Sequence, residues 1–227
     1  MTLSAEQRRE RLIGLYKEVS TCTKCPLHET RGKAVFGAGD ADAELMFVGE
    51  APGAEEDRQG LPFVGRAGQL LNQLLEEIGL SREGVFIANV LKSRPPGNRD
   101  PLPLEVEACE PYLFEQVRLI EPKVVCTLGN FATKLLTGSP VGITKVRGTP
   151  QLHELGGRAV FLLPLLHPAA ALRTPAMKET LRADFATIPG LLAGPSPDPA
   201  PEVEEIAADT ATAEPPSLPV DQLDFFG

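Results

Sequence analysis

Apolar residues along the chain fall into short runs that alternate with amphipathic segments. The runs predict buried strands at Ala43–Val48, Val85–Leu91, Val124–Leu128 and Ala159–Leu165. Helical spacing and capping signals predict helices at Ser4–Val19, Ala67–Ile78, Leu104–Ile120, Asn130–Leu136 and Ala176–Ile188. Apolar strands between helices are typical of a parallel sheet covered on both faces. We therefore expect an α/β fold of three layers, α/β/α, around a central, mainly parallel four-stranded sheet.

The last part of the chain differs from the rest in composition. From Pro195 to Gly227 there are eight acidic residues and no Lys or Arg, and Pro, Ala, Ser and Thr are frequent. Such a segment lacks the apolar side chains that offset the entropy cost of ordering, so we expect about Gly194–Val220 to be disordered. The sequence thus predicts a domain over residues 1–193 and an acidic tail over 194–227.

The net charge of −9 comes mostly from this tail. Without the tail's eight acidic residues the body has 23 acidic and 22 basic residues, a net charge of −1. A near-neutral body can carry a local basic face, so nucleic acid is not excluded as a partner. No run of about 18 apolar residues occurs, and the charged N-terminal segment has no apolar core. We expect no membrane span and no secretion, but a cytoplasmic, nucleoid-associated protein.

The densest group of unusual residues is the loop Gly49–Gly68, GEAPGAEEDRQGLPFVGRAG. Its five glycines allow positive φ and close approach of a ligand to the backbone. Turn glycines on a surface are the plainer interpretation, but loops of this length are more often functional. This loop, the loop after Leu91 and the loop at His167 each follow a predicted strand. Ligands of parallel sheets bind at the carboxyl ends of strands, so we expect the three loops to form one site.

Several polar residues near these loops are candidates for that site. His167 ends the last predicted strand, where a structural or a functional histidine is equally expected. Leu172 and Arg173 pair an apolar wedge with a cation, which suits insertion into a duplex. Basic residues in two short loops can bind phosphates or simply face solvent; they are Lys92, Arg94, Arg99, Lys145 and Arg147.

The four cysteines lie in a chain expected in a compartment where structural disulfides are rare. Cys22 and Cys25 form a CxxC motif in a loop after a helix, whereas a redox dithiol normally opens a helix after a strand. Cys109 lies in a predicted helix, and Cys126 lies in mid-strand, where a buried free thiol is the ordinary case. This set predicts zinc or an iron–sulfur cluster, and spacing alone does not separate the two.

Together these motifs resemble the family 4 uracil-DNA glycosylases. The resemblance covers about Cys22–Arg173 and rests on CTKC, the Gly49–Gly68 loop, NVLKSRPPGNRDP, LGNFA, ITKVRG and HPAAALR, in that order. It implies a three-layer α/β/α fold, a 4Fe–4S cluster and the removal of uracil from DNA. Uracil-containing DNA would be the partner of a monomeric enzyme.

The resemblance also implies how the base is bound. The backbone of Gly49, Glu50 and Ala51 would line the uracil pocket. Phe63 would stack on the flipped base, and the amide of Asn89 would read the uracil edge. An Asn can donate to O4 and accept from N3–H, which is the reverse of what cytosine presents. A wrong base would leave polar groups unpaired.

For the reaction, the resemblance implies that His167 stabilises the leaving uracil. Glu50 and Glu55 match acidic positions of the first motif, and either carboxylate can position water and stabilise the sugar cation. Leu172 would fill the gap left by the flipped nucleotide. Two other interpretations remain: a relative that binds or traps uracil-DNA without turnover, and a metal-stabilised nucleic-acid-binding module.

The cluster ligands implied by the resemblance include one departure from the family pattern. They map to Cys22, Cys25, Cys109 and position 93, where this chain has Ser93 in place of the usual Cys. Ser93 can ligate as an alkoxide, Cys126 can substitute, or the fourth iron can be labile. We expect a cluster held by three thiolates, with the fourth ligand open.

The C-terminal sequence QLDFF carries a second resemblance, to the short motif by which bacterial repair proteins bind the sliding clamp. An apolar peptide at the end of an acidic tether suits docking into a groove, although short matches also arise by chance. The predicted contact residues are Gln222, Leu223, Phe225 and Phe226.

Overall fold

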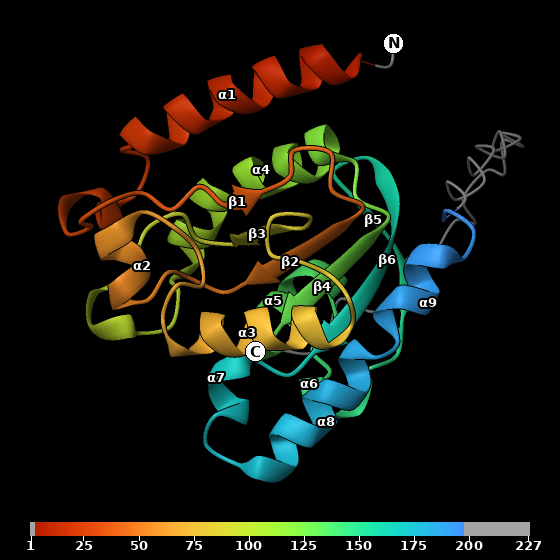
Figure 1. Cartoon of the computed structure of the whole chain (residues 1–227). Helices are drawn as coiled ribbons and strands as arrows, with labels where there is room; N and C mark the ends of the chain where they lie inside the picture. Colours follow the sequence, from red (N-terminus) through yellow and green to blue (C-terminus); the bar gives the residue numbers. More distant parts are fainter. Residues whose placement is uncertain (1–2, 198–227) are drawn as a thin grey trace, which may run out of the picture.

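The computed structural model describes residues 3–197 (Figure 1). Its helices are α1 Ala5–Thr21, α2 Ala54–Gln59, α3 Arg66–Glu77, α4 Pro103–Ile120, α5 Asn130–Thr137, α6 Ile143–Val146, α7 Pro168–Ala171, α8 Pro175–Phe185 and α9 Ile188–Ala193. Its strands are β1 Ala38–Gly39, β2 Leu45–Gly49, β3 Phe86–Asn89, β4 Val124–Leu128, β5 Gln151–Leu155 and β6 Arg158–Leu165. Short 3₁₀ turns lie at Pro26–Glu29 and Pro96–Asn98.

The sheet has six strands in the order β1-β3-β2-β4-β6-β5. The four inner strands are parallel and are the four that the apolar runs predict, whereas β1 and β5 pair antiparallel at the edges. The predicted α/β class is confirmed, but the strand number was too low. The two missed strands have no apolar run, because β1 has two residues and β5 alternates partly buried and exposed positions.

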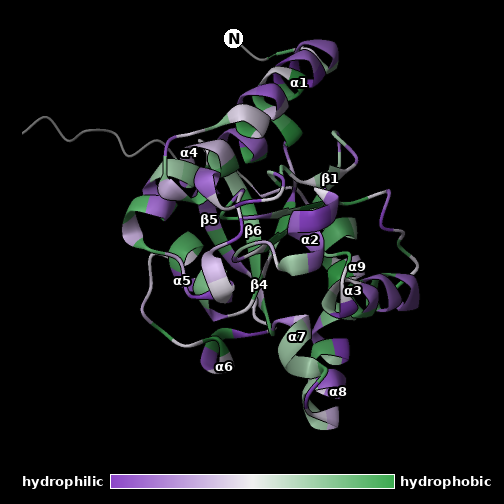
Figure 2. Ribbon diagram, turned by 90° about the vertical axis from the view of Figure 1, so that its left-hand side faces the viewer, coloured by the Kyte–Doolittle hydropathy of each residue, from purple (hydrophilic) through white to green (hydrophobic). Residues whose placement is uncertain are grey.

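Helices cover both faces of the sheet (Figure 1). Side chains such as Met46 and Val48 pack with α1, α4 and α5, while their neighbours Leu45 and Phe47 pack with α3, α8 and α9. Successive side chains of a strand point to opposite faces, so a continuous apolar run fills both cores. Figure 2 shows the contrast between the interior and the surface, with hydrophobic residues along β4 and hydrophilic residues on α2.

The N-terminal helix starts where the capping signal places it. The Ser4 backbone N–H donates to the Gln7 side chain at 2.9 Å, and the Gln7 N–H donates to the Ser4 hydroxyl at 3.3 Å. None of the helices within residues 3–197 is long and apolar enough to cross a membrane. The predicted clamp-binding peptide Gln222–Phe226 and most of the predicted acidic tail lie outside the described residues.

Candidate active site

A cavity of about 560 Å³ lies at the carboxyl ends of the parallel strands. Its wall includes Glu50 and Ala51 after β2, Asn89 at the end of β3, and His167 after β6. Phe63, from the loop before α3, completes this group. The structure therefore brings together the segments that were expected to converge, as the rule for parallel sheets predicts.

Asn89 presents an unused hydrogen-bond acceptor to the cavity. Its side chain is buried, and its Oδ1 has no hydrogen-bond partner within residues 3–197. Gly49 is its register partner on β2, and a Cβ built at Gly49 would lie 2.4 Å from this oxygen. A buried acceptor without a partner costs free energy, so such an atom at a cavity indicates a ligand that supplies the donor.

Phe63 is held in a strained and tightly enclosed conformation. Its φ is 49°, in the left-handed region that non-glycine residues rarely adopt. A Cβ on Gly68 would lie 1.7 Å from the Phe63 carbonyl oxygen, so only glycine permits this approach. Arg82 donates to that carbonyl at 2.9 Å and also to the carbonyl of Pro62. No sequence pattern indicates this role of Arg82, which lies in a loop 19 residues further along the chain.

His167 lies beside Phe63, with ring centroids 5.7 Å apart and planes at 28°. The backbone N–H of Ala169, in α7, donates to His167 Nδ1 at 3.1 Å. This bond leaves the ring proton on Nε2. Burial lowers the pKa of His167 to about 4, against a smaller raising effect of Glu56. The ring is therefore a neutral hydrogen-bond donor near pH 7.

Glu50 and Glu55, the two carboxylates that the resemblance singles out, have different surroundings. Glu50 is partly buried, and burial followed by repulsion from Asp100 raises its pKa. It also lines a second cavity of about 900 Å³ beside α4 and α5. The Glu55 side chain is 43% exposed, and its hydrogen bonds to Arg58 and Gln59 lower its pKa to about 2. Glu50, not Glu55, thus lies at the wall of the cavity.

Glu56 has a role that sequence reasoning missed. Its carboxylate accepts hydrogen bonds from the backbone N–H groups of Val64 and Gly65, both at 2.9 Å. These bonds hold the loop that carries Phe63 against α2. This helix was also missed, because Ala54–Gln59 contains no apolar residue beyond alanine and so no helical periodicity.

The predicted phosphate contacts are not all at the surface. Lys92 is 2% exposed and its ammonium bonds within the protein, so the expectation that it contacts DNA was wrong. Arg147, at the end of α6, pairs with Asp184 at 2.6 Å and so joins α6 to α8. The sequence could not show these contacts, because each cation bonds to a buried side chain that lies far away along the chain.

Other predicted DNA contacts do lie around the cavity mouth or at the surface. Arg99 and Arg173 line the cavity, although Arg99 also pairs with Glu105 at 2.5 Å. Leu172 is 39% exposed, beside exposed Arg173. The remaining two are partly or fully exposed: Arg94 and Lys145.

The cysteines divide between the two faces of the sheet. Cys22, Cys25 and Cys109 belong to the core that includes α1 and α4. Cys126 belongs to the opposite core, so it cannot substitute as their fourth partner. Burial raises the pKa of the Cys126 thiol, as expected for an apolar strand position. The suggestion of Cys126 as a substitute ligand was therefore wrong.

The three remaining thiols influence one another. Burial raises the pKa of Cys109, and the nearby Cys25 and Cys22 raise it further, against the lowering effect of the Lys92 backbone N–H. Ser93 is buried, and Arg31 donates to its hydroxyl at 3.2 Å. Within residues 3–197 no three such side chains are close enough to hold one metal ion. A 4Fe–4S cluster binds its thiolates on four separate irons and does not need three ligands around one ion, so the three neighbouring cysteines are compatible with it.

This arrangement defines an α/β protein with a ligand-sized cavity at the carboxyl end of its sheet, lined by Phe63, Asn89 and His167. The family model "Uracil DNA glycosylase superfamily" matches residues 36–186, and the chain belongs to this superfamily. It is 48% identical to the Type-4 uracil-DNA glycosylase of Sulfurisphaera tokodaii, over 76% of this chain and 80% of that protein. The Type-4 enzyme of Archaeoglobus fulgidus is 45% identical, over 79% and 92%. That of Thermotoga maritima is 49% identical, over 73% and 85%.

Proposed function

We propose that this chain is a uracil-DNA glycosylase, which flips uracil out of DNA and hydrolyses its N-glycosidic bond. The observation that carries the proposal is the buried Oδ1 of Asn89, which has no partner in the described part of the chain and lies in a cavity shared with Phe63 and His167. The names of the relatives agree with it. Such a reaction leaves an abasic site and starts base excision repair.

Recognition follows from the donors and acceptors of the pocket. Uracil carries a donor at N3 and an acceptor at O4, which complement Oδ1 and the amide NH₂ of Asn89. Cytosine presents the reverse pattern and would leave Oδ1 unpaired. Phe63 supplies the stacking face, and the backbone of Gly49, Glu50 and Ala51 lines the rest of the pocket. The base must leave the duplex to reach this site.

Cleavage places negative charge on the departing uracil and positive charge on the sugar. The neutral His167 donates from Nε2 to the uracil and so stabilises its anion. Glu50, which lies at the cavity wall with a raised pKa, positions the water and stabilises the sugar cation. We assign this role to Glu50 rather than Glu55, because the Glu55 carboxylate is engaged by Arg58 and Gln59.

The DNA would lie across the cavity mouth. Leu172 would enter the space left by the flipped nucleotide, and Arg173 would contact the adjacent phosphate. Arg94, Arg99 and Lys145 would add phosphate contacts. The enzyme would work as a monomer on the nucleoid in the cytoplasm.

An excision assay tests the function. A labelled oligonucleotide with one uracil is incubated with the protein and then cleaved with alkali at abasic sites. Release of free uracil over many turnovers is the expected result. A stable protein–DNA adduct would support the trapping interpretation, and binding without either product would support a nucleic-acid-binding module. The matched oligonucleotide with cytosine is the control.

We further propose that Cys22, Cys25 and Cys109 hold a 4Fe–4S cluster whose fourth corner faces Ser93. When bound, the cluster would cross-link the N-terminal loop to α4. Iron and sulfide analysis and absorbance of anaerobically purified protein test its presence. Because an open corner loses its iron first, the Ser93→Cys variant should retain four irons longer in air. Stoichiometric zinc, or a fully active protein without metal, would contradict the proposal.

The C-terminal peptide Gln222–Phe226 is proposed to bind the bacterial sliding clamp. Its support is the sequence alone: two aromatic residues, Phe225 and Phe226, at the end of an acidic tether. Deleting residues 221–227 should abolish clamp binding in a surface-immobilisation assay and leave excision from free oligonucleotides unchanged. Unchanged clamp affinity after deletion would refute it.

A further inference from the structure

The buried cation Lys92 follows Asn89 by three residues. Its Nζ donates to the carbonyl oxygen of Asn89 at 2.8 Å, to Oε1 of Gln116 at 2.6 Å and to the carbonyl oxygen of Phe36 at 3.3 Å. Three acceptors around one nitrogen are all satisfied only by the ammonium form, which carries three N–H groups, while burial lowers the pKa of Lys92 to about 7. None of these partners is a carboxylate, so Lys92 is not part of an ordinary ion pair.

The acceptors of Lys92 come from three separate parts of the fold. Gln116 lies on α4, is fully buried, and also donates from Nε2 to the Phe36 carbonyl at 2.9 Å. Phe36 lies just before β1, and the adjacent Val35 N–H donates to the Lys92 carbonyl at 2.7 Å. Lys92 therefore joins the end of β3 to α4 and to the edge of the sheet.

The Lys92 contacts lie just beyond the last hydrogen-bonded residue pairs of β1 and β3. The two strands pair only at Ala38 with Ile87 and at Gly39 with Phe86. Beyond these pairs the carbonyl groups of Phe36 and Asn89 both accept from the same ammonium. Without Lys92, the Asn89 carbonyl and Oε1 of Gln116 would lose this donor, and the Phe36 carbonyl would keep only its bond from Gln116 Nε2. The backbone at Asn89 would then be free to shift.

We propose that Lys92 is a positioning residue for base recognition, which fixes the backbone of Asn89 and thereby the direction of its side-chain amide. Asn89 depends on this support because, among the described residues 3–197, no donor bonds its Oδ1 and orients the amide. The orientation of the amide is then set by its packing against Gly49 and by the position of the Asn89 backbone. The inference rests on the proposed function, since it concerns the residue assigned to the uracil edge.

A double-mutant cycle between Lys92 and Asn89 tests this role. Lys92→Met keeps the length of the side chain and removes all three donors. In the wild-type background it should lower kcat/KM for a uracil oligonucleotide by about 10-fold or more. In the Asn89→Ala background it should cost less than about 3-fold, because residues that act through one another are not additive.

The matched control is Lys123→Met. Lys123 also donates to backbone carbonyls, those of Leu192 and Gly194, but at the opposite end of the sheet. Its loss should change thermal stability and leave kcat/KM the same in both backgrounds. If Lys92→Met does not fold, Gln116→Met provides the same test, because Lys92 then keeps only two of its acceptors. It should give a smaller loss that also disappears in the Asn89→Ala background.

Two results would overturn the inference: no loss of kcat/KM in folded Lys92→Met, or an equal loss in both Asn89 backgrounds. Failure of the proposed function looks different, because the wild-type protein would then release no uracil. In that event the same four proteins are compared by their affinity for uracil-containing against thymine-containing oligonucleotides. Lys92→Met should then reduce the preference for uracil only where Asn89 is present, and an additive result would again refute the inference.

Discussion

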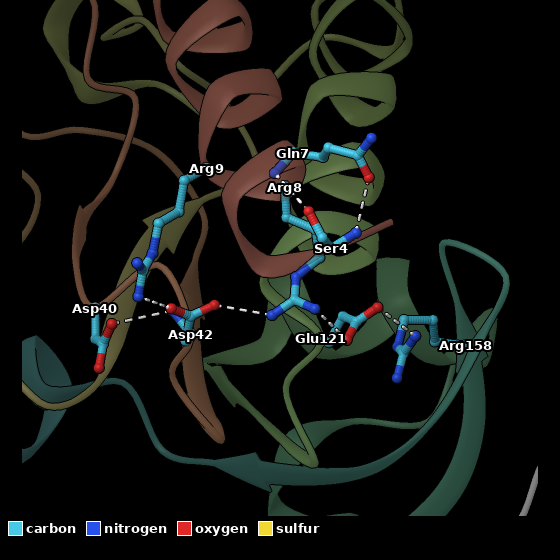
Figure 3. A network of polar contacts seen from close by, with 8 residues as sticks. All are labelled: Ser4, Gln7, Arg8, Arg9, Asp40, Asp42, Glu121 and Arg158. Atoms are coloured by element: carbon cyan, nitrogen blue, oxygen red, sulfur yellow. Dashed lines mark hydrogen bonds and ion pairs between the residues drawn. The ribbon is translucent and has the colours of Figure 1, made fainter. Parts of the chain in front are cut away.

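The polar side chains at the two ends of the sheet differ in whether they are paired with one another. Near the amino ends of the strands, charged side chains form a continuous network (Figure 3). Arg8 pairs with Asp42 at 2.8 Å and with Glu121 at 3.0 Å, and Glu121 also pairs with Arg158 at 2.9 Å. Arg9 adds a further bond to Asp42. Within residues 3–197 the Nε groups of Arg8 and Arg158 lack partners, but both guanidinium groups are paired through terminal nitrogens, Arg8 through Nη1 and Nη2 and Arg158 through Nη1.

At the carboxyl ends, the groups that matter are left without partners. The Oδ1 of Asn89 has no donor within residues 3–197, and burial keeps His167 neutral beside Phe63. Paired charges join segments and stabilise the fold, whereas unpaired polar groups in a cavity are available to form hydrogen bonds with a ligand. Variants at the carboxyl ends of the strands should therefore change catalysis, and variants at the amino ends should change stability.

The largest effect is expected from His167→Ala. Removing one preorganised donor to a developing anion costs on the order of 100- to 1,000-fold in kcat. Affinity for the oligonucleotide should change far less, because the phosphate contacts remain. Single-turnover excision and fluorescence anisotropy measure the two quantities. A proportional loss of both would mean that His167 binds DNA rather than the transition state.

Gly49→Ala should break the pocket by shape alone. The added Cβ would lie 2.4 Å from Asn89 Oδ1 and 2.6 Å from the Phe63 ring, so both groups must move. A displacement near 1 Å at reacting groups costs on the order of 100-fold in kcat. Gly14→Ala, where a Cβ meets nothing within 4 Å, is the control and should retain full activity. Equal activity of the two variants would show that the pocket tolerates rearrangement.

Much of this comparison was accessible from the sequence, because it follows from local patterns. The apolar runs gave the four parallel strands, and the rule for their carboxyl ends placed Asn89 and His167 in one cavity. Helix α2 and the edge strands β1 and β5 lack apolar periodicity and were missed.

Lys92 shows why other residues could not be placed. In the sequence it is a cation at the start of a Pro- and Gly-rich loop, which is typical of a surface. Its burial depends on Gln116, 24 residues later, and on Phe36, 56 residues earlier. The roles of Arg82 and Glu56 likewise depend on hydrogen bonds to backbone groups that only the folded loop presents. No local pattern encodes such contacts.

At the amino end, Glu121→Gln should lower stability and leave catalysis unchanged. The substitution removes the charge that Arg8 and Arg158 share, and the Glu121 side chain is 26% exposed, so part of the interaction is screened. A loss of about 1 kcal/mol is expected, which corresponds to a decrease of about 2–4 °C in Tm. Differential scanning calorimetry and the excision assay measure the two outcomes. A large loss of kcat would contradict the division between the two ends.

The smallest effect is expected from Asp100→Asn, in the second cavity, which Glu50 also lines. Burial raises the pKa of Glu50, and repulsion from Asp100 raises it further. Glu50 must be ionised to position water, so the rate falls as the pH drops through this raised pKa. Removing the Asp100 charge lowers the pKa of Glu50 and should move the acid limb of the kcat profile to lower pH, by less than about one unit. The shift should shrink in high salt, because Asp100 is exposed. If the acid limb does not move, it reports the ionisation of another group, and the proposed role of Glu50 in positioning water is refuted.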